Sequence, residues 1–264
     1  MMKATDNVLL SEDGRGVVTV TLNRPDVHNA FDDALIARLT ETFEALAGRA
    51  DVRVVVLTGA GKSFSAGGDL GWMRRMAGYS EADNRADAAR LAFMLHRLDT
   101  LPQPTIARVN GAALAGGFGL VACCDVAIAG EGAVFGLSEV RLGLVPATIA
   151  PYVIAAIGAR AARRYMLTGE RFGAVEALRI GLVHRAVQAG ELDAGVAEIV
   201  AALALGGPLA VAETKALVLG IGDLATEAVR ADTARLIARV RASAEGKDGV
   251  SAFLEKRKPK WQGS

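Results

Sequence analysis

The strongest limit on the fold of this chain comes from a run of apolar, mostly β-branched residues at positions 52–58, VRVVVLT, which ends at Gly59. A strand that lacks polar alternation has both of its faces buried, as in a sheet that helices cover on each side. Residues 16–22, 106–109 and 125–128 carry further strand patterns. The sequence therefore predicts a sheet whose interior strands are shielded from solvent.

Helical patterns alternate with these strands. Asp32 and Asp33 open a helix with apolar residues at helical spacing, and residues 81–98 carry an apolar stripe. Residues 115–124 read as a short buried helix that starts at a glycine pair. Strands and helices that alternate in this way indicate the α/β class.

The pattern changes after Val183, where only helices are expected. These helices are predicted at residues 192–205, 209–219, 225–240 and 250–258. We therefore divide the chain into an α/β core at residues 1–190 and a helical C-terminal region at residues 191–264.

The amino-acid composition limits the kinds of partner that the chain can bind. The chain has 264 residues, of which 52% are hydrophobic and 22% charged, which is typical of one main globular folding unit. Its formal charge is +1, and its only basic run is the short one at residues 256–258. No electrostatic footprint for nucleic acid is visible, so no nucleic-acid partner is expected.

Neither a metal site nor a secreted protein is indicated. Cys123 and Cys124 are the only cysteines, they are adjacent, and no Cys/His cluster surrounds them. The first 12 residues lack a basic stretch followed by an apolar core, and no apolar run is long enough to span a membrane. We expect a cytoplasmic protein without a membrane partner.

Three short motifs fail as functional signatures. The stretch GAGKSF at residues 59–64 follows a strand, but Phe64 replaces the third glycine of the dinucleotide fingerprint. A phosphate loop would need a glycine at Val56. Around Ser65 the sequence is SFSAG, which lacks the first glycine of a hydrolase nucleophile elbow.

Two glycine-rich elements follow two successive buried strands. They are FSAGGDL at residues 64–70 and NGAALAGGFG at residues 110–119. Glycines let backbone N–H groups approach a ligand closely, and a helix that begins at Gly116 adds its positive dipole end. Two such N–H donors could hold one developing oxyanion. The same glycines could instead serve only tight turns and helix packing.

Taken together, these segments closely resemble the enoyl-CoA hydratase/isomerase (crotonase) family over nearly the whole chain. The resemblance covers residues 23–31, the two glycine-rich elements, and residues 135–146 with the sequence FGLSEVRLGLVP. It implies a spiral ββα core, oxyanion donors at the N–H groups of Gly68 and Gly116, and a catalytic Glu139. It also implies assembly into a homotrimer or a homohexamer, and no cofactor beyond the coenzyme A of the substrate.

The same resemblance implies contacts with coenzyme A. The backbone of Ala66 and Leu70 would meet the adenine, Lys62 and Arg24 would meet phosphates, and Phe253 and Lys256 would reach coenzyme A across a subunit boundary. The surrounding loop residues Ala30, Gly67 and Asp69 belong to the same predicted binding surface. For Arg24, Lys62 and Lys256 a plain solvated surface charge is the alternative.

The sequence departs from the family pattern at one catalytic position. Members with two glutamates carry the other one three residues after Gly116, where this chain has Gly119. Glu139 is therefore alone, and an apolar pocket would raise its pKa toward neutrality so that it can give and take protons. A single glutamate suits a 1,3-proton shift, which is Δ3,Δ2-enoyl-CoA isomerisation.

Against isomerisation, residues 69–76 and 138–152 resemble bacterial methylglutaconyl-CoA and isohexenylglutaconyl-CoA hydratases, in which a glycine at this position is part of the resemblance. We therefore favour a lyase that hydrates a branched glutaconyl-type CoA ester, in leucine degradation or related fatty acid metabolism. Arg141 or Arg74 could pair with the substrate carboxylate, because a guanidinium binds a carboxylate bidentately. A non-catalytic acyl-CoA-binding scaffold is the third reading.

Overall fold

A six-stranded sheet forms the centre of the computed structural model, which describes residues 6–188, 190–221 and 227–263. Its strands lie in the order β1 (Val8–Glu12), β2 (Val17–Leu22), β3 (Val54–Gly59), β5 (Thr105–Val109), β7 (Val126–Gly130) and β10 (Arg185–Val187). Only the β1 and β2 pair is antiparallel; the other neighbours run parallel. The expected α/β class with parallel interior strands under helices is confirmed.

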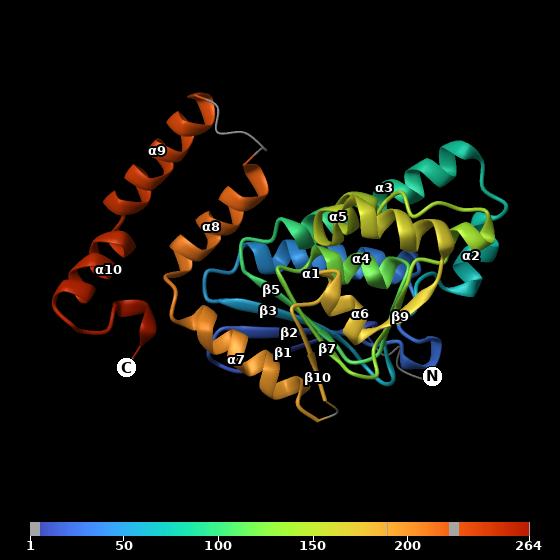
Figure 1. Cartoon of the computed structure of the whole chain (residues 1–264), viewed down its shortest axis with the longest axis horizontal. Coiled ribbons are helices and arrows are strands. Elements are labelled where there is room, and N and C mark those ends of the chain that lie inside the picture. The colour runs from blue at the N-terminus through green and yellow to red at the C-terminus, as the bar shows by residue number, and fades with distance from the viewer. Residues whose placement is uncertain (1–5, 189, 222–226, 264) are drawn as a thin grey trace.

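Strand β3 shows why its sequence is apolar throughout. Val55 and Leu57 point into the main hydrophobic core, while Val54 and Val56 belong to a second cluster on the other face of the sheet. The main core is covered by α1 (Asp33–Ala47), α3 (Glu81–Asp99), α4 (Gly116–Cys123) and α5 (Ala150–Thr168) (Figure 1). Helix α7 (Leu192–Ala204) covers the second cluster through Leu192 and Val196. The sheet thus needs both layers, and α7, although it lies beyond residue 190, packs on the core.

A smaller sheet lies beside the first one. Its four strands are β4 (Ser63–Ser65), β6 (Ala112–Leu114), β8 (Val134–Gly136) and β9 (Arg171–Gly173), in that order. Strands β4, β6 and β8 are parallel, and β9 is antiparallel to β8. The glycine-rich elements therefore lie on short strands of this second sheet, which follow the long strands β3 and β5.

The remaining elements connect and extend these layers. They are the helices α2 (Leu70–Met76), α6 (Ala174–Arg179), α8 (Pro208–Gly220), α9 (Glu227–Ala242) and α10 (Ala244–Leu254), with 3₁₀ turns η1 (Pro25–Val27), η2 (Glu139–Leu142) and η3 (Lys260–Gln262). Helices α9 and α10 extend away from the sheets (Figure 1). Among the described residues no single helix could cross a membrane; α7 and α8 together are long and apolar enough, but a 104° bend separates them.

Two predictions for the C-terminal region were wrong in detail. Residues after Val183 are not only helical, because β10 adds a parallel strand beside β7. The last helix starts at Ala244, not at residue 250, because the Ser243 side chain accepts a hydrogen bond from the Gly246 N–H and caps it. Residues 225 and 226 of the predicted third helix lie outside the described residues.

Candidate active site

Three parallel strands of the small sheet end at the same edge, and each leads into a predicted catalytic residue. Strand β4 leads to Gly68, β6 to Gly116 and β8 to Glu139. The segments after β6 and β8 stay paired beyond the strands, since the Ala115 N–H donates to the Gly136 carbonyl at 2.9 Å. The sheet topology therefore brings together residues that lie up to about seventy positions apart in the chain.

The two glycine-rich segments touch each other directly. Gly67 has a φ of +91°, and a Cβ placed there would lie 3.1 Å from the Ala115 Cβ. A Cβ on Gly117 would overlap the Ser65 carbonyl oxygen. These glycines permit a close approach of two backbones that larger residues would hold apart.

Phe31 contacts both glycine-rich segments. It forms a β-bridge with Gly68, its N–H donates to the Gly67 carbonyl at 2.7 Å, and its carbonyl accepts from the Asp69 N–H at 2.8 Å. A Cβ on Gly116 would lie 2.8 Å from Cε2 of the same buried ring. One side chain therefore sets the spacing of both glycines, and sequence analysis did not single it out.

The N–H groups of Gly68 and Gly116 are available to a ligand. In the described part of the chain neither of them donates a hydrogen bond to a protein acceptor. Gly116 is the first residue of α4, so its N–H lies at the positive end of that helix. Two free donors on touching segments are the arrangement that an oxyanion requires.

Glu139 lies three residues after β8, at the strand edge to which β4 and β6 also lead. It begins η2, and its carbonyl accepts from the Leu144 N–H at 3.0 Å. Burial raises the pKa of the Glu139 carboxyl group above its ordinary value. Its Oε2 atom is buried and has no hydrogen-bond partner among the described residues. A partly buried carboxylate with an unused oxygen and a raised pKa is suited to proton transfer.

The absent second glutamate has a steric explanation. A Cβ on Gly119 would overlap Cγ2 of Ile149 and lie 3.0 Å from its Cβ. Ile149 is 2% exposed and packs in the main core. Hydrocarbon therefore occupies the space into which a side chain at position 119 would extend.

Arg24 and Lys62 are the two residues that are predicted to meet phosphates of coenzyme A. Arg24 is tied into the chain, since it donates to the Ala30 carbonyl at 2.5 Å and pairs with Asp32 at 2.8 Å and with Asp69 at 3.2 Å. Lys62 is exposed. The Arg24 contacts organise the loop, and its predicted contact with a phosphate stays a prediction, as does that of Lys62.

Asp69 and its neighbours position the start of α2. The Asp69 carboxylate accepts from the N–H groups of Gly71 and Trp72 at 2.8 and 3.1 Å, which caps the helix. Burial opposes ionisation, but these two N–H groups and Arg24 together hold the pKa of Asp69 below its ordinary value. Leu70 is 71% exposed, and the Ala66 N–H donates to the His28 carbonyl. The cap fixes the geometry of the segment that carries Gly68.

Three predicted residues do not join the site within one chain. Arg141 turns toward the end of α5, where it donates to the Thr168 carbonyl at 3.4 Å and covers Gly169. Phe253 is 83% exposed on α10, and Lys256 is exposed just after it. Helix α10 extends away from the sheets (Figure 1), so the role of these two residues in binding stays a prediction about a partner subunit.

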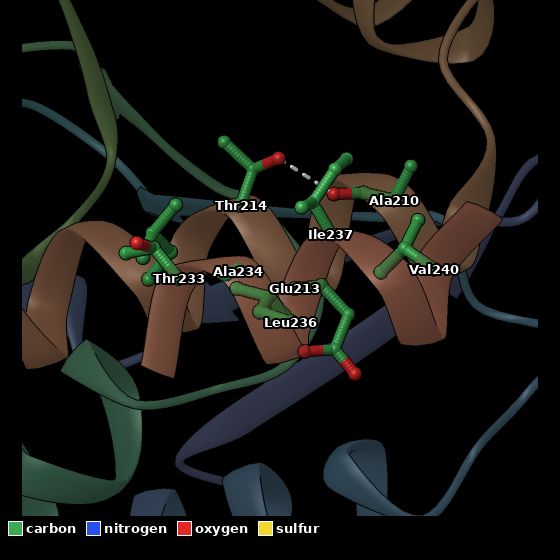
Figure 2. Close-up of a pocket in the computed structure, with 9 residues that line it drawn as sticks. Ala210, Glu213, Thr214, Thr233, Ala234, Leu236, Ile237 and Val240 are labelled. Atoms are coloured by element: carbon green, nitrogen blue, oxygen red, sulfur yellow. Dashed lines mark hydrogen bonds between the residues drawn. The ribbon is translucent and has the colours of Figure 1, made fainter. Parts of the chain in front are cut away.

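A cavity between two C-terminal helices lies away from this edge. It has a volume of about 630 Å³ and separates α8 from α9 (Figure 2). Its lining is mostly apolar, and its one carboxylate, Glu213, pairs with Arg239 at 2.6 Å. It therefore offers no group for proton transfer. Among the described residues no group of three or more His, Cys, Asp or Glu side chains could hold a metal ion.

Comparison with known proteins agrees with this architecture. The sequence-family model described as enoyl-CoA hydratase/isomerase matches residues 12–264. A putative enoyl-CoA hydratase of Thermus thermophilus is 35% identical over 93% of this chain and 97% of its own length. The 2,3-dehydroadipyl-CoA hydratase of Escherichia coli is 34% identical over 94% of this chain and 95% of its own length.

Solved structures give the same result. An enoyl-CoA hydratase from Shewanella pealeana is 43% identical, with a TM-score of 0.93 over 97% of this chain and 96% of that one. AtuE of Pseudomonas aeruginosa is 40% identical, with a TM-score of 0.94 over 97% of this chain and 100% of that one. The chain belongs to the enoyl-CoA hydratase/isomerase family.

Proposed function

We propose that this protein is an enoyl-CoA hydratase, which adds water to an α,β-unsaturated acyl-CoA thioester. The observation that carries the proposal is the partly buried Glu139, whose buried Oε2 atom has no partner among the described residues, at the strand edge to which the segments with the free N–H groups of Gly68 and Gly116 also lead. Several relatives, such as those from Thermus thermophilus and Escherichia coli, are named as hydratases.

Hydration can be completed with Glu139 as the one carboxylate that transfers protons. Glu139 takes a proton from water while the water oxygen bonds to the β-carbon, and the electrons of the double bond move to the thioester oxygen. The N–H groups of Gly68 and Gly116 stabilise the resulting enolate oxyanion. Glu139 then returns its proton to the α-carbon, and the thioester carbonyl forms again.

For the substrate, we propose a branched glutaconyl-type CoA ester, which carries a second carboxyl group. Two relatives are named 2,3-dehydroadipyl-CoA hydratase and mevalonyl-coenzyme A hydratase, so functionalised acyl chains occur among them. Arg74 is exposed on α2, near the segment of Gly68, and is the better candidate to pair with such a carboxylate, because Arg141 already contacts the end of α5. This substrate would place the enzyme in leucine degradation.

Δ3,Δ2-Enoyl-CoA isomerisation is the second candidate. The observation that favours it is the overlap of Ile149 with the space above Gly119, which leaves Glu139 without a second carboxylate at that position. One carboxylate can remove a proton from the α-carbon and return it to the γ-carbon. Both reactions use the same oxyanion donors.

We also propose a cytoplasmic homotrimer or homohexamer that uses no cofactor besides the coenzyme A of its substrate. Large apolar side chains on the short helix α10 support assembly, since Val250, Phe253 and Leu254 are 59%, 83% and 72% exposed. Exposed apolar groups of this kind mark interaction surfaces.

Three substrates offered in parallel test the proposal: 3-methylglutaconyl-CoA, crotonyl-CoA and a 3-enoyl-CoA. Hydration of the glutaconyl ester, seen as loss of conjugated absorbance with a mass gain of one water, is the expected result. Glu139→Gln should abolish it, whereas Glu81→Gln at the exposed start of α3 should not.

Two other outcomes of this experiment would each establish an alternative function. Conversion of the 3-enoyl ester to the conjugated ester without hydration of any substrate would establish the isomerase. Calorimetric binding of acyl-CoA by the wild type without turnover of any of the three substrates would establish the scaffold.

A further inference from the structure

The segment that carries Glu139 has a single fully buried side chain. Residues 138–152 are all described, and Ile149 is the only buried residue among them. Leu142, Leu144 and Val145 are 60%, 53% and 73% exposed. Between the end of η2 and the start of α5, Ile149 is therefore the one buried apolar side chain that anchors this segment.

That side chain occupies a notch that exists because residue 119 is a glycine. Cγ2 of Ile149 takes the place of a Cβ at position 119, and Leu95 of α3 borders the same spot, with its Cδ2 atom 3.8 Å from that Cβ position. Gly119 lies in α4, one turn after the oxyanion donor Gly116, and its N–H donates to the Ala115 carbonyl at 3.1 Å. The notch is thus part of the helix whose first N–H belongs to the site.

We infer that Ile149 is a positioning residue for Glu139: its γ2 methyl group, seated over Gly119, fixes the segment of the general base against the helix that supplies the oxyanion donor. The inference rests on the proposed function, in which Glu139 transfers protons. It also assigns a role to Gly119 beyond the loss of a carboxylate, since any side chain there would expel Ile149.

The contact of Ile149 with Gly119 links the position of Glu139 to its pKa. A carboxylate keeps a raised pKa only while its segment stays packed against the protein, because burial is the cause of the shift. If the Ile149 side chain no longer packs over Gly119, Glu139 moves toward solvent and away from the reacting atoms. A displacement of about 1 Å at a catalytic group can lower turnover by about 100-fold.

Kinetics of three variants test the inference. Ile149→Ala should lower kcat about 10- to 100-fold with little change in KM, and should shift the acidic limb of the kcat profile to lower pH. Ile149→Val keeps the γ2 methyl group and should restore both kcat and the profile to near wild type. Ile157→Ala, a control at another buried isoleucine of α5, should lower the melting temperature but leave the pH profile in place.

A stability cycle tests the contact without reference to catalysis. Gly119→Ala should lower the melting temperature in the wild type, and should lower it less in the Ile149→Ala background, where the overlapping Cγ2 atom is gone and only the Cβ of residue 149 remains, at 3.0 Å. Additive effects, or an Ile149→Ala variant whose kcat and pH profile match those of Ile157→Ala, would overturn the inference. Full activity of Glu139→Gln would instead overturn the proposed function, while the stability cycle would still report on the notch.

Discussion

The raised pKa that suits Glu139 to proton transfer also lowers the free energy of unfolding. Burial raises the pKa of Glu139 in the folded protein above the ordinary value of 4.5, so between the two values the folded protein holds a proton that the unfolded chain has released. The free energy of unfolding therefore falls as the pH rises through this window. Glu139→Gln removes this cost, and urea unfolding should show a variant that is more stable than the wild type at pH 7 and equally stable below about pH 4. A difference that does not change with pH would contradict the account.

The two oxyanion glycines differ in how much room surrounds them. A Cβ on Gly116 would meet the buried Phe31 ring at 2.8 and 2.9 Å, whereas a Cβ on Gly68 would lie at the ordinary distance of 3.4 Å from the flexible Met73. Gly116→Ala should therefore displace its N–H and lower kcat by about 10- to 100-fold. Gly68→Ala, the matched variant, should lose less than about threefold. Equal losses in steady-state assays would show that Phe31 does not set the spacing.

Helix α8 is held to the sheet by one well-buried charge. The Lys215 ammonium group, 8% exposed, donates to Asp125 at 2.7 Å and to the Gln103 carbonyl at 3.3 Å, and Asp125 also accepts from Thr105. Lys215→Met keeps the length of the side chain but leaves Asp125 without its cation. We expect a loss of about 2 kcal/mol in denaturant unfolding, less than for a fully buried pair because Asp125 is 29% exposed. Lys62→Met, at an exposed lysine, should cost nothing measurable; equal losses would refute the anchor.

Elements differ in how far the sequence predicts them. Strand β3 was predictable because six successive buried residues leave a strong apolar signal. Strands β4, β6 and β8 have three residues each, too few to show a period, so the second sheet was not predicted. Helix α5 was hidden by Pro151 in its first turn and by Gly158, whose φ of 71° bends it.

The residues of the candidate site also differ in how far the sequence predicts them. Gly68, Gly116 and Glu139 could be named from the sequence because they lie in motifs that the family resemblance covers, and their catalytic roles stay a prediction. Phe31 and Ile149 were not, because a buried aromatic or aliphatic residue looks like any other core residue in a sequence. Their roles depend on contacts between distant segments, such as Ile149 with Gly119, which only the folded chain shows.

At the scale of the whole molecule, Phe253 on α10 and Lys256 just after it are exposed, and α10 lies apart from α4, the helix that begins at Gly116 (Figure 1). If these residues complete the coenzyme A site of a partner subunit, two defective proteins should repair each other. One carries Glu139→Gln with an intact C-terminal region, and the other carries Phe253→Ala and Lys256→Ala with an intact Glu139.

Co-assembled mixtures of these two proteins should regain a fraction of the wild-type activity at low substrate concentration, because some sites combine the Glu139 of one subunit with the C-terminal residues of another. Light scattering would establish the size of the assembly, and assays before and after mixing would measure the gain. Activity equal to the sum of the separate variants, in an assembly shown to contain both, would mean that each site is built within one chain. Residues 253 and 256 would then be surface residues of the assembly, and coenzyme A would have to be held by the segment at residues 62–70 of the same subunit alone.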